Sequence, residues 1–160
     1  MKRNRKKAIK LALGLGAIAG MRATFAPSLA SQFLNNNSFK SLSKSNLKFI
    51  QLPISNLITK ILSTGEIVGD KLPVAPNRTS APQLITRIIS GALVGATIFQ
   101  AYKQKRITGL VLGGLSALTM TYASFYVRKY FANAYKIEDA ILGGIEDTIA
   151  IGTGIGLIKT

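Results

Sequence analysis

The segment from Lys136 to Ile158, KIEDAILGGIEDTIAIGTGIGLI, constrains the fold most, because it is apolar enough to cross a bilayer yet carries four of the chain's six carboxylates. A helix of about 20 residues, rising ~1.5 Å per residue, spans the hydrocarbon core. Carboxylates at that depth are costly and need protein partners, water or an interface. The four are Glu138, Asp139, Glu146 and Asp147. The segment therefore predicts a membrane helix with buried charges.

The composition combines 48% hydrophobic residues with a formal net charge of +15. Its basic residues lie mostly between apolar blocks, as they do when they flank membrane spans and meet anionic headgroups. A nucleic-acid-binding protein would instead spread basic residues over one face and interleave aromatic ones. We therefore expect the lipid bilayer and its anionic headgroups as partners at the basic termini and loops, and no nucleic acid.

Cysteine and histidine are both absent. Their absence excludes disulfides, thiolate or imidazole metal ligands, cysteine nucleophiles and histidine-based catalytic triads. We expect no enzyme, no cofactor and no metal site.

All fifteen glycines fall inside apolar segments. Five segments each hold two glycines four residues apart, a spacing that places both on one face of a helix and lets helices approach closely in lipid. The pairs are Gly16/Gly20, Gly65/Gly69, Gly91/Gly95, Gly109/Gly113 and Gly152/Gly156.

The pattern predicts a single integral membrane domain over residues 1–160: an all-α, polytopic helix bundle of four to five Gly-rich transmembrane helices. The expected spans are 8–30, with a kink near Pro27, then 50–72, 83–102, 107–127 and 137–158. A polar loop is expected over 31–46 and a Pro-rich connector over 73–82. Two alternatives stay open: the 50–72 segment lies in the interface instead of crossing, or the first segment is a secretory signal cleaved after Ala30.

Lys and Arg in the loops orient the five-span arrangement. Six basic residues before Leu11 place the amino terminus inside. The carboxyl terminus and the 31–46 loop then lie outside, and Arg22 lies apart, within the first span. This arrangement predicts a cluster at the cytoplasmic leaflet formed by Glu66, Asp70, Arg87, Arg128, Glu138 and Asp139.

Several stretches resemble a family of small bacterial integral membrane proteins catalogued only as a domain of unknown function. They are GMRATFAP (20–27), GDKLPVAPNRT (69–79), RIISGALVGA (87–96) and the two Glu-Asp pairs of the last segment. The resemblance implies a multi-pass architecture in the bacterial cytoplasmic membrane and implies no activity.

Two functions remain open for the carboxylates. On a helix, Asp139 and Glu146 fall within about 20° of each other and ~10 Å apart along the axis. A small transporter or channel-like protein would use these residues to bind or relay cations or protons, and a chain of this length would need a homo-oligomer to build a pathway. Its candidate site residues are Glu146, Asp139, Glu138, Asp147, Glu66 and Asp70. A structural or interaction protein would use the carboxylates only as partners of Arg22, Arg87 and Arg128.

Overall fold

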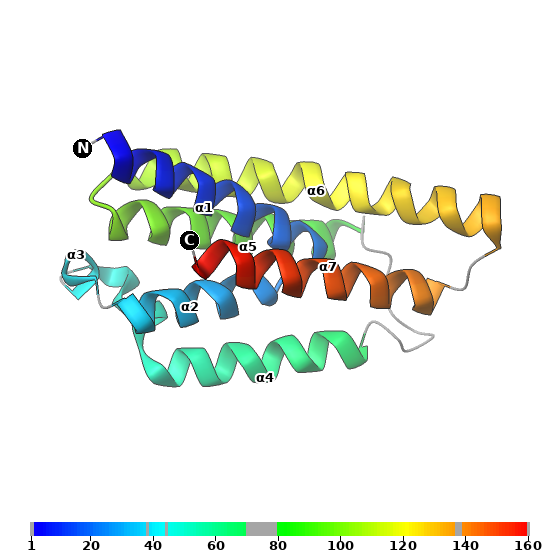
Figure 1. Ribbon diagram of the computed structural model, residues 1–160, viewed down its shortest axis with the longest axis horizontal. Helices are drawn as coiled ribbons and strands as arrows, with labels where there is room; N and C mark the ends of the chain where they lie inside the picture. Colours follow the sequence, from blue (N-terminus) through cyan, green and yellow to red (C-terminus); the bar gives the residue numbers. More distant parts are fainter. Residues whose placement is uncertain (1, 38, 44, 70–79, 137–138, 160) are drawn as a thin grey trace.

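The computed structural model describes residues 2–37, 39–43, 45–69, 80–136 and 139–159, and these ranges hold seven α-helices and one short 3-10 helix (Figure 1). The prediction of an all-α fold is confirmed. The elements are α1 (Lys2–Met21), α2 (Phe25–Asn37), α3 (Lys40–Ser43), η1 (Asn46–Gln51), α4 (Pro53–Gly69), α5 (Ala81–Ala101), α6 (Arg106–Tyr135) and α7 (Asp139–Lys159).

Among the described residues, three helices are long and apolar enough to cross a membrane: α5, α6 and the Ile141–Lys159 part of α7. They correspond to the expected spans 83–102, 107–127 and 137–158. Helix α6 continues past residue 127 and ends at Tyr135, where Lys136 adopts a left-handed backbone conformation with φ 52°. Helix α4 has 17 residues; whether it crosses a membrane stays a prediction. The Pro-rich connector expected over 73–82 lies mostly outside the described residues.

The first expected span, 8–30, is not one helix. Helix α1 ends at Met21, residues 22–24 turn the chain, and α2 runs back in the opposite direction (Figure 1). Pro27 lies in the first turn of α2, where a missing N–H costs nothing. Proline therefore begins a second helix here and does not kink a single one.

The prediction of a polar loop over 31–46 is also wrong for residues 31–37. Residues 31–37 continue α2, where Phe33 and Leu34 are buried in the core. The Asn37 side chain donates to the Phe33 carbonyl at 2.8 Å near the helix end. Polar composition predicted a solvated loop, but two large apolar side chains anchor this stretch as a helix.

The reversal at residues 22–24 changes the side on which every later segment begins. Both termini lie toward the same end of the bundle, whereas they were expected on opposite sides (Figure 1). Lys7 and Lys10 of α1 and Lys159 of α7 line one cavity at that end. The end of α4 and the starts of α5 and α7 lie at the opposite end (Figure 1), so the prediction that α5 and α7 begin on the side of the amino terminus is wrong. Asp70 and Glu138 of the expected cluster lie outside the described residues.

Helices α1, α5 and α6 pack through small residues. A Cβ atom at Gly95 would overlap the carbonyl oxygen of Gly109, and one at Gly16 would lie 2.6 Å from that of Gly113. Backbones this close need glycine on the facing surface. The pairs that form these contacts are Gly16/Gly20, Gly91/Gly95 and Gly109/Gly113, whereas Gly65, Gly152 and Gly156 face open space.

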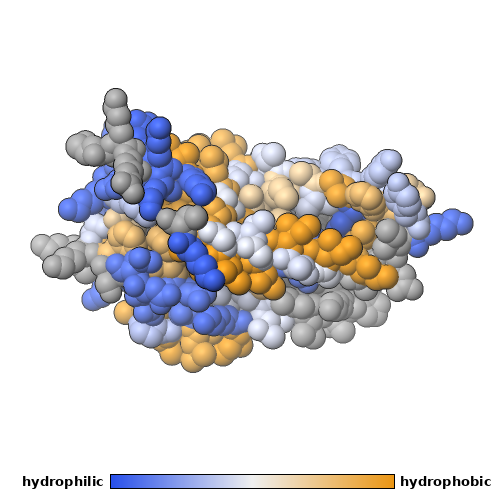
Figure 2. Space-filling view, in the orientation of Figure 1, coloured by the Kyte–Doolittle hydropathy of each residue, from blue (hydrophilic) through white to orange (hydrophobic). Residues whose placement is uncertain are grey.

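Helix α4 has its apolar face outward. Ile54, Leu57 and Ile61 are exposed, whereas Ser63 is buried and donates to the Thr24 carbonyl at 3.0 Å. In a water-soluble protein the apolar face of α4 would be packed against the core, because folding in water buries apolar surface. Figure 2 shows apolar patches on α4 and α7, and it shows hydrophilic residues gathered at the end of the bundle where both termini lie. An apolar exterior with polar ends is typical of a protein surrounded by lipid.

Candidate functional site

The turn between α1 and α2 is buried within the bundle, and its carbonyl groups accept hydrogen bonds from neighbouring helices. Arg87 of α5 is 1% exposed, and its Nη1 donates to the carbonyls of Gly20 at 2.7 Å and Met21 at 2.6 Å. Thr121 of α6 donates to the same Gly20 carbonyl at 3.1 Å. The last carbonyls of a helix lack intrahelical partners, and a cation at this negative end of the dipole is favourable. Arg87 thus caps α1.

Two serines complete the capping of the turn. Ser90 of α5 donates to the Ala23 carbonyl, and Ser63 of α4 donates to the Thr24 carbonyl at 3.0 Å. Helices α4, α5 and α6 therefore supply donors to four carbonyls, two at the end of α1 (Gly20 and Met21) and two in the turn (Ala23 and Thr24). This accounts for a non-helical segment in an apolar interior, where an unsatisfied carbonyl would be costly.

The turn lies well inside the helices that surround it. Arg87 is six residues past the start of α5, which corresponds to ~9 Å along the helix axis. Asp147 is eight residues past the start of α7, or ~12 Å. Both depths fall within the helices that are long and apolar enough to cross a membrane.

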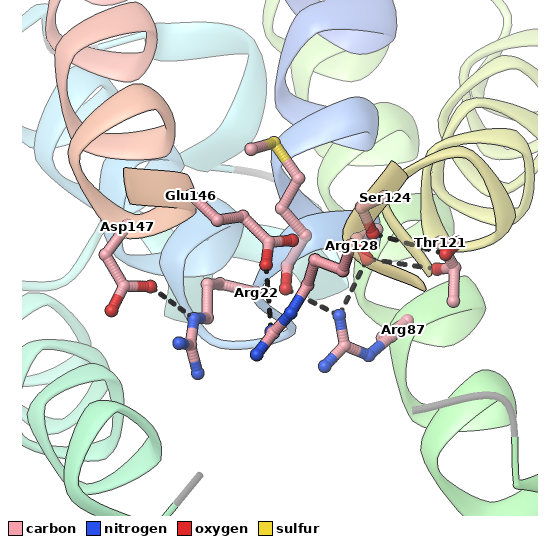
Figure 3. A network of polar contacts seen from close by, with 9 residues as sticks. Arg22, Arg87, Thr121, Ser124, Arg128, Glu146 and Asp147 are labelled. Atoms are coloured by element: carbon pink, nitrogen blue, oxygen red, sulfur yellow. Dashed lines mark hydrogen bonds and ion pairs between the residues drawn. The ribbon is translucent and has the colours of Figure 1, made fainter. Parts of the chain in front are cut away.

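Two ion pairs adjoin the turn, and both use α7 (Figure 3). Nε of Arg22 lies 2.5 Å from Oδ1 of Asp147, with side chains 2% and 11% exposed. Nη1 of Arg128 lies 3.2 Å from Oε2 of Glu146, with side chains 13% and 7% exposed. Adjacent residues on a helix point about 100° apart, so Asp147 reaches the end of α1 while Glu146 reaches α6.

We call Arg22, Arg87, Arg128, Glu146 and Asp147 the buried charge cluster. Figure 3 shows the three guanidinium groups pointing to the same side of the turn. Three cations close together repel one another unless negative charge compensates them. Here two carboxylates and the carbonyl end of α1 supply it, so each charge has a neighbour of opposite sign.

This cluster contains five of the nine predicted site residues. Arg22 was expected to lie apart from the others, and that expectation is wrong, because the chain reversal brings it to α7. Asp139 begins α7 and Glu66 lies on α4, but the structure describes only their backbone. Asp70 and Glu138 lie outside the described residues.

The site residues predicted from the sequence did not include the buried hydroxyl groups that donate hydrogen bonds to backbone carbonyls. Ser63, Ser90, Thr121 and Ser124 are buried, and the first three donate to carbonyls of the turn or of Gly20. The signal was available, because isolated hydroxyl residues on apolar helices often bond to backbone carbonyls. Within the described ranges, no three acidic residues lie close enough to hold a metal ion.

The chain matches the family described as "Domain of unknown function (DUF4126)" over residues 9–158. The chain belongs to this family. The matched range contains the whole buried charge cluster, and the expected resemblance to a family of unknown function is confirmed. No curated protein and no solved structure matches the chain. The DUF4126 match assigns no activity.

Proposed function

We propose that this DUF4126 protein is a multi-pass protein of the bacterial cytoplasmic membrane in which the buried carboxylates hold helices together as partners of arginines. One observation carries the proposal: Glu146 and Asp147 are both buried, and they pair with Arg128 of α6 and with Arg22 of the turn after α1, respectively. A cation bound by these carboxylates would have to displace a guanidinium group. The proposal assigns no catalytic role to the cluster.

The two ion pairs connect α7 to the rest of the bundle. Part of the α7 surface makes no close contact with other helices. Gly144, Gly152 and Gly156 face open space, and an apolar cavity of about 390 Å³ lies between α6 and α7. The Arg128–Glu146 pair bridges the two helices at this cavity. In lipid, apolar side chains give no hydrophobic force between helices, so polar contacts and close packing must position α7.

Charge distribution supports a membrane orientation with both termini in the cytoplasm, because Lys and Arg are enriched in cytoplasmic loops. At the opposite end, the described segments carry three basic residues: Arg128, Lys129 and Lys136. At the end where both termini lie, the described segments carry twelve of the 21 Lys and Arg: Lys2, Arg3, Arg5, Lys6, Lys7, Lys10, Lys40, Lys48, Lys103, Lys105, Arg106 and Lys159.

Single and double substitutions of one pair test the proposal. Glu146→Gln leaves Arg128, whose side chain is 13% exposed, without this carboxylate, and losing one partner of a fully buried pair costs about 3–5 kcal/mol, which is the upper bound here. Glu146→Gln and Arg128→Gln should each lower the free energy of unfolding in detergent, and the double variant should recover most of the loss. Lys129→Gln, at an exposed neighbouring position, is the matched control and should change little.

If Glu146→Gln folds as well as the parent protein, the structural role of this carboxylate is wrong. That result would support a second candidate function, in which the protein is a small transporter or channel-like protein that binds or relays cations or protons with these carboxylates. One observation favours it, the buried non-helical turn between α1 and α2, because irregular backbone at membrane depth is tolerated where it lies inside the protein and transporters use such backbone at their binding sites. Protonation of Glu146 would remove its charge and loosen α7 from Arg128.

The transporter candidate makes a different prediction for the same variant. Glu146→Gln in proteoliposomes should then fold normally and lose pH-dependent ion flux. This candidate also needs a homo-oligomer to enclose a pathway, which cross-linking in native membranes would detect. Under the structural proposal, flux is absent in both the parent protein and the variant.

A further inference from the structure

Another cavity lies at the end of the bundle where both termini lie, and its lining comes from α1, α2, α7 and the residue that follows α5. Leu11 and Phe33 line it and are buried, whereas Lys7, Lys10 and Lys159 line it and are exposed. The cavity therefore has an apolar inner wall and a rim that carries positive charge.

Three lysines contribute to this rim, and no Asp or Glu lines the cavity within the part of the chain that the structure describes. Lys7 and Lys10 are three residues apart on α1, a spacing that places both on one face of the helix. Lys159 comes from the end of α7. Ammonium groups held around one space repel one another, and an anion between them offsets that repulsion. The rim thus favours a negatively charged ligand.

The two helices that carry the lysines are packed against each other beside the cavity. A Cβ atom at Gly14 of α1 would lie 2.5 Å from Cδ1 of Leu157 of α7. Gly14 follows Lys10 by about one helical turn, and Leu157 precedes Lys159 by two residues. The backbone positions of the rim are therefore fixed before a ligand arrives, which lowers the cost of ordering them on binding.

Tyr102 adds a neutral hydrogen-bond donor to the lining. Its ring centroid lies 5.3 Å from that of Phe39, a contact that positions the side chain. Burial raises the pKa of the Tyr102 hydroxyl, so this group stays protonated at neutral pH and can donate to an anion. The lining thus combines cationic groups with a hydroxyl donor, which are the groups that bind phosphate oxygens.

The cavity lies at the level where two of the long apolar helices end. Tyr102 follows the last residue of α5, and Lys159 is the last residue of α7. In a membrane the ends of such helices lie among the headgroups, and basic pockets between them on the cytoplasmic side bind anionic headgroups. The volume of about 260 Å³, compared with ~30 Å³ for one water molecule in the liquid, accommodates a phosphate group and the polar atoms attached to it.

We propose that this cavity binds the phosphate group of an anionic ligand, held by the rim lysines and the hydroxyl of Tyr102. The headgroup of an anionic phospholipid and a soluble phosphate compound offer the same chemistry. The phosphate site rests on the lining residues alone. A lipid as the source of the phosphate rests in addition on the proposed membrane location.

Binding is measured on the full chain in a neutral detergent at constant ionic strength, as the rise in the midpoint temperature of unfolding, because a ligand of the folded state stabilises it. The ligands are short-chain phosphatidylglycerol and inorganic phosphate. Lys10→Gln/Lys159→Gln removes two rim charges. Lys103→Gln/Lys105→Gln is the matched control, because it removes two exposed lysines that follow α5 at the same end and do not line the cavity.

We expect the control to match the parent protein, and the rim variant to need a several-fold higher phosphatidylglycerol concentration for the same rise. Tyr102→Phe keeps the ring and removes only the hydroxyl, so it should also weaken binding, and it provides the test if the rim variant does not fold. Equal titrations of the rim variant, Tyr102→Phe and the control would overturn the site. Stabilisation of the parent protein by neither ligand would overturn it as well.

The choice of ligand separates the two sources. If inorganic phosphate acts at lower concentration than the lipid and loses its effect in the rim variant, the phosphate site holds and its ligand is soluble. Equal stabilisation by short-chain phosphatidylcholine would show that net negative charge is not recognised and would overturn the anion site. These results leave the ion pairs of α7 untouched, because Lys159 lies twelve residues past Asp147, or ~18 Å along the helix.

Discussion

Arg22 and Asp147 are separated by 125 residues in the sequence, yet Nε of one lies 2.5 Å from Oδ1 of the other in the interior of the bundle. The pair joins the buried turn after α1 to the middle of α7. It forms because α1 ends at Met21 and the chain reverses there. The buried turn and the two ion pairs of α7 are thus parts of one arrangement.

The two ion pairs should differ in strength. Arg22 and Asp147 are closer and more buried as a pair than Arg128 and Glu146, which lie 3.2 Å apart with the arginine side chain 13% exposed. Charge interactions strengthen as water is excluded. Arg22→Gln should therefore lower the free energy of unfolding more than Arg128→Gln, measured by denaturant titration in the same detergent. The reverse order would show that burial does not set their contribution.

Arg87 should be needed for the end of α1. Arg87→Met removes two hydrogen bonds to the carbonyls of Gly20 and Met21, and charge-assisted bonds contribute about 1.5–3 kcal/mol each. We expect increased hydrogen exchange at the end of α1 and lower stability. Arg106→Met, at an exposed position, is the control. Unchanged exchange in Arg87→Met would contradict its capping role.

Glycine position should decide which substitutions the bundle tolerates. Gly113→Leu places a large side chain against the backbone of Gly91 and should sharply reduce the folded yield in detergent. Gly152→Leu makes the same chemical change where the structure shows open space and should be tolerated. Size-exclusion chromatography of both variants measures the difference. Equal yields would show that close packing of α5 and α6 does not limit folding.

Both termini should report from the cytoplasm. The long helices alternate in direction, and both chain ends lie toward the basic end of the bundle (Figure 1). Fusions of a phosphatase and of a fluorescent protein to each terminus measure its side. A carboxyl terminus outside the cell would show that an odd number of segments crosses, as the sequence alone had predicted.

The sequence predicted α5, α6 and α7 because each is a long apolar segment between charged residues. It did not predict the full length of α6, because Arg128 and Lys129 were taken as the end of a span. Tyr130 and Phe131 continue the helix beyond the apolar segment. Hydropathy detects the part of a helix that suits lipid, whereas the helix itself ends only where backbone bonding stops.

The turn at residues 22–24 had a recognisable signal. Thr24 precedes Phe25 and Pro27, and threonine followed by a proline in the first turn is typical of a helix start. The Thr24 carbonyl accepts from the Ser28 N–H at 3.2 Å, as at the beginning of a helix. Hydropathy averaged along a segment does not resolve a turn of only three residues. The apolar segment over residues 8–30 was therefore predicted as one continuous span.

The membership of the charge cluster could be predicted only in part. Buried carboxylates and arginines were recognisable as residues that need partners in an apolar environment. Their pairing depended on the chain reversal, which places Arg22 and Asp147 side by side. Sequence spacing along one helix indicated a shared face for Asp139 and Glu146, but partners on other helices are set by the tertiary fold.

A double-mutant cycle on Arg22 and Asp147 tests the central claim most directly. Asp147→Asn and Arg22→Gln keep side chains of similar shape while removing charge, and losing either partner of a buried pair costs about 3–5 kcal/mol. We predict that each single variant is strongly destabilised in detergent and that the double variant recovers most of the loss. If the two single losses simply add in the double variant, the two side chains do not interact, and the account of α7 as a helix held by ion pairs is wrong.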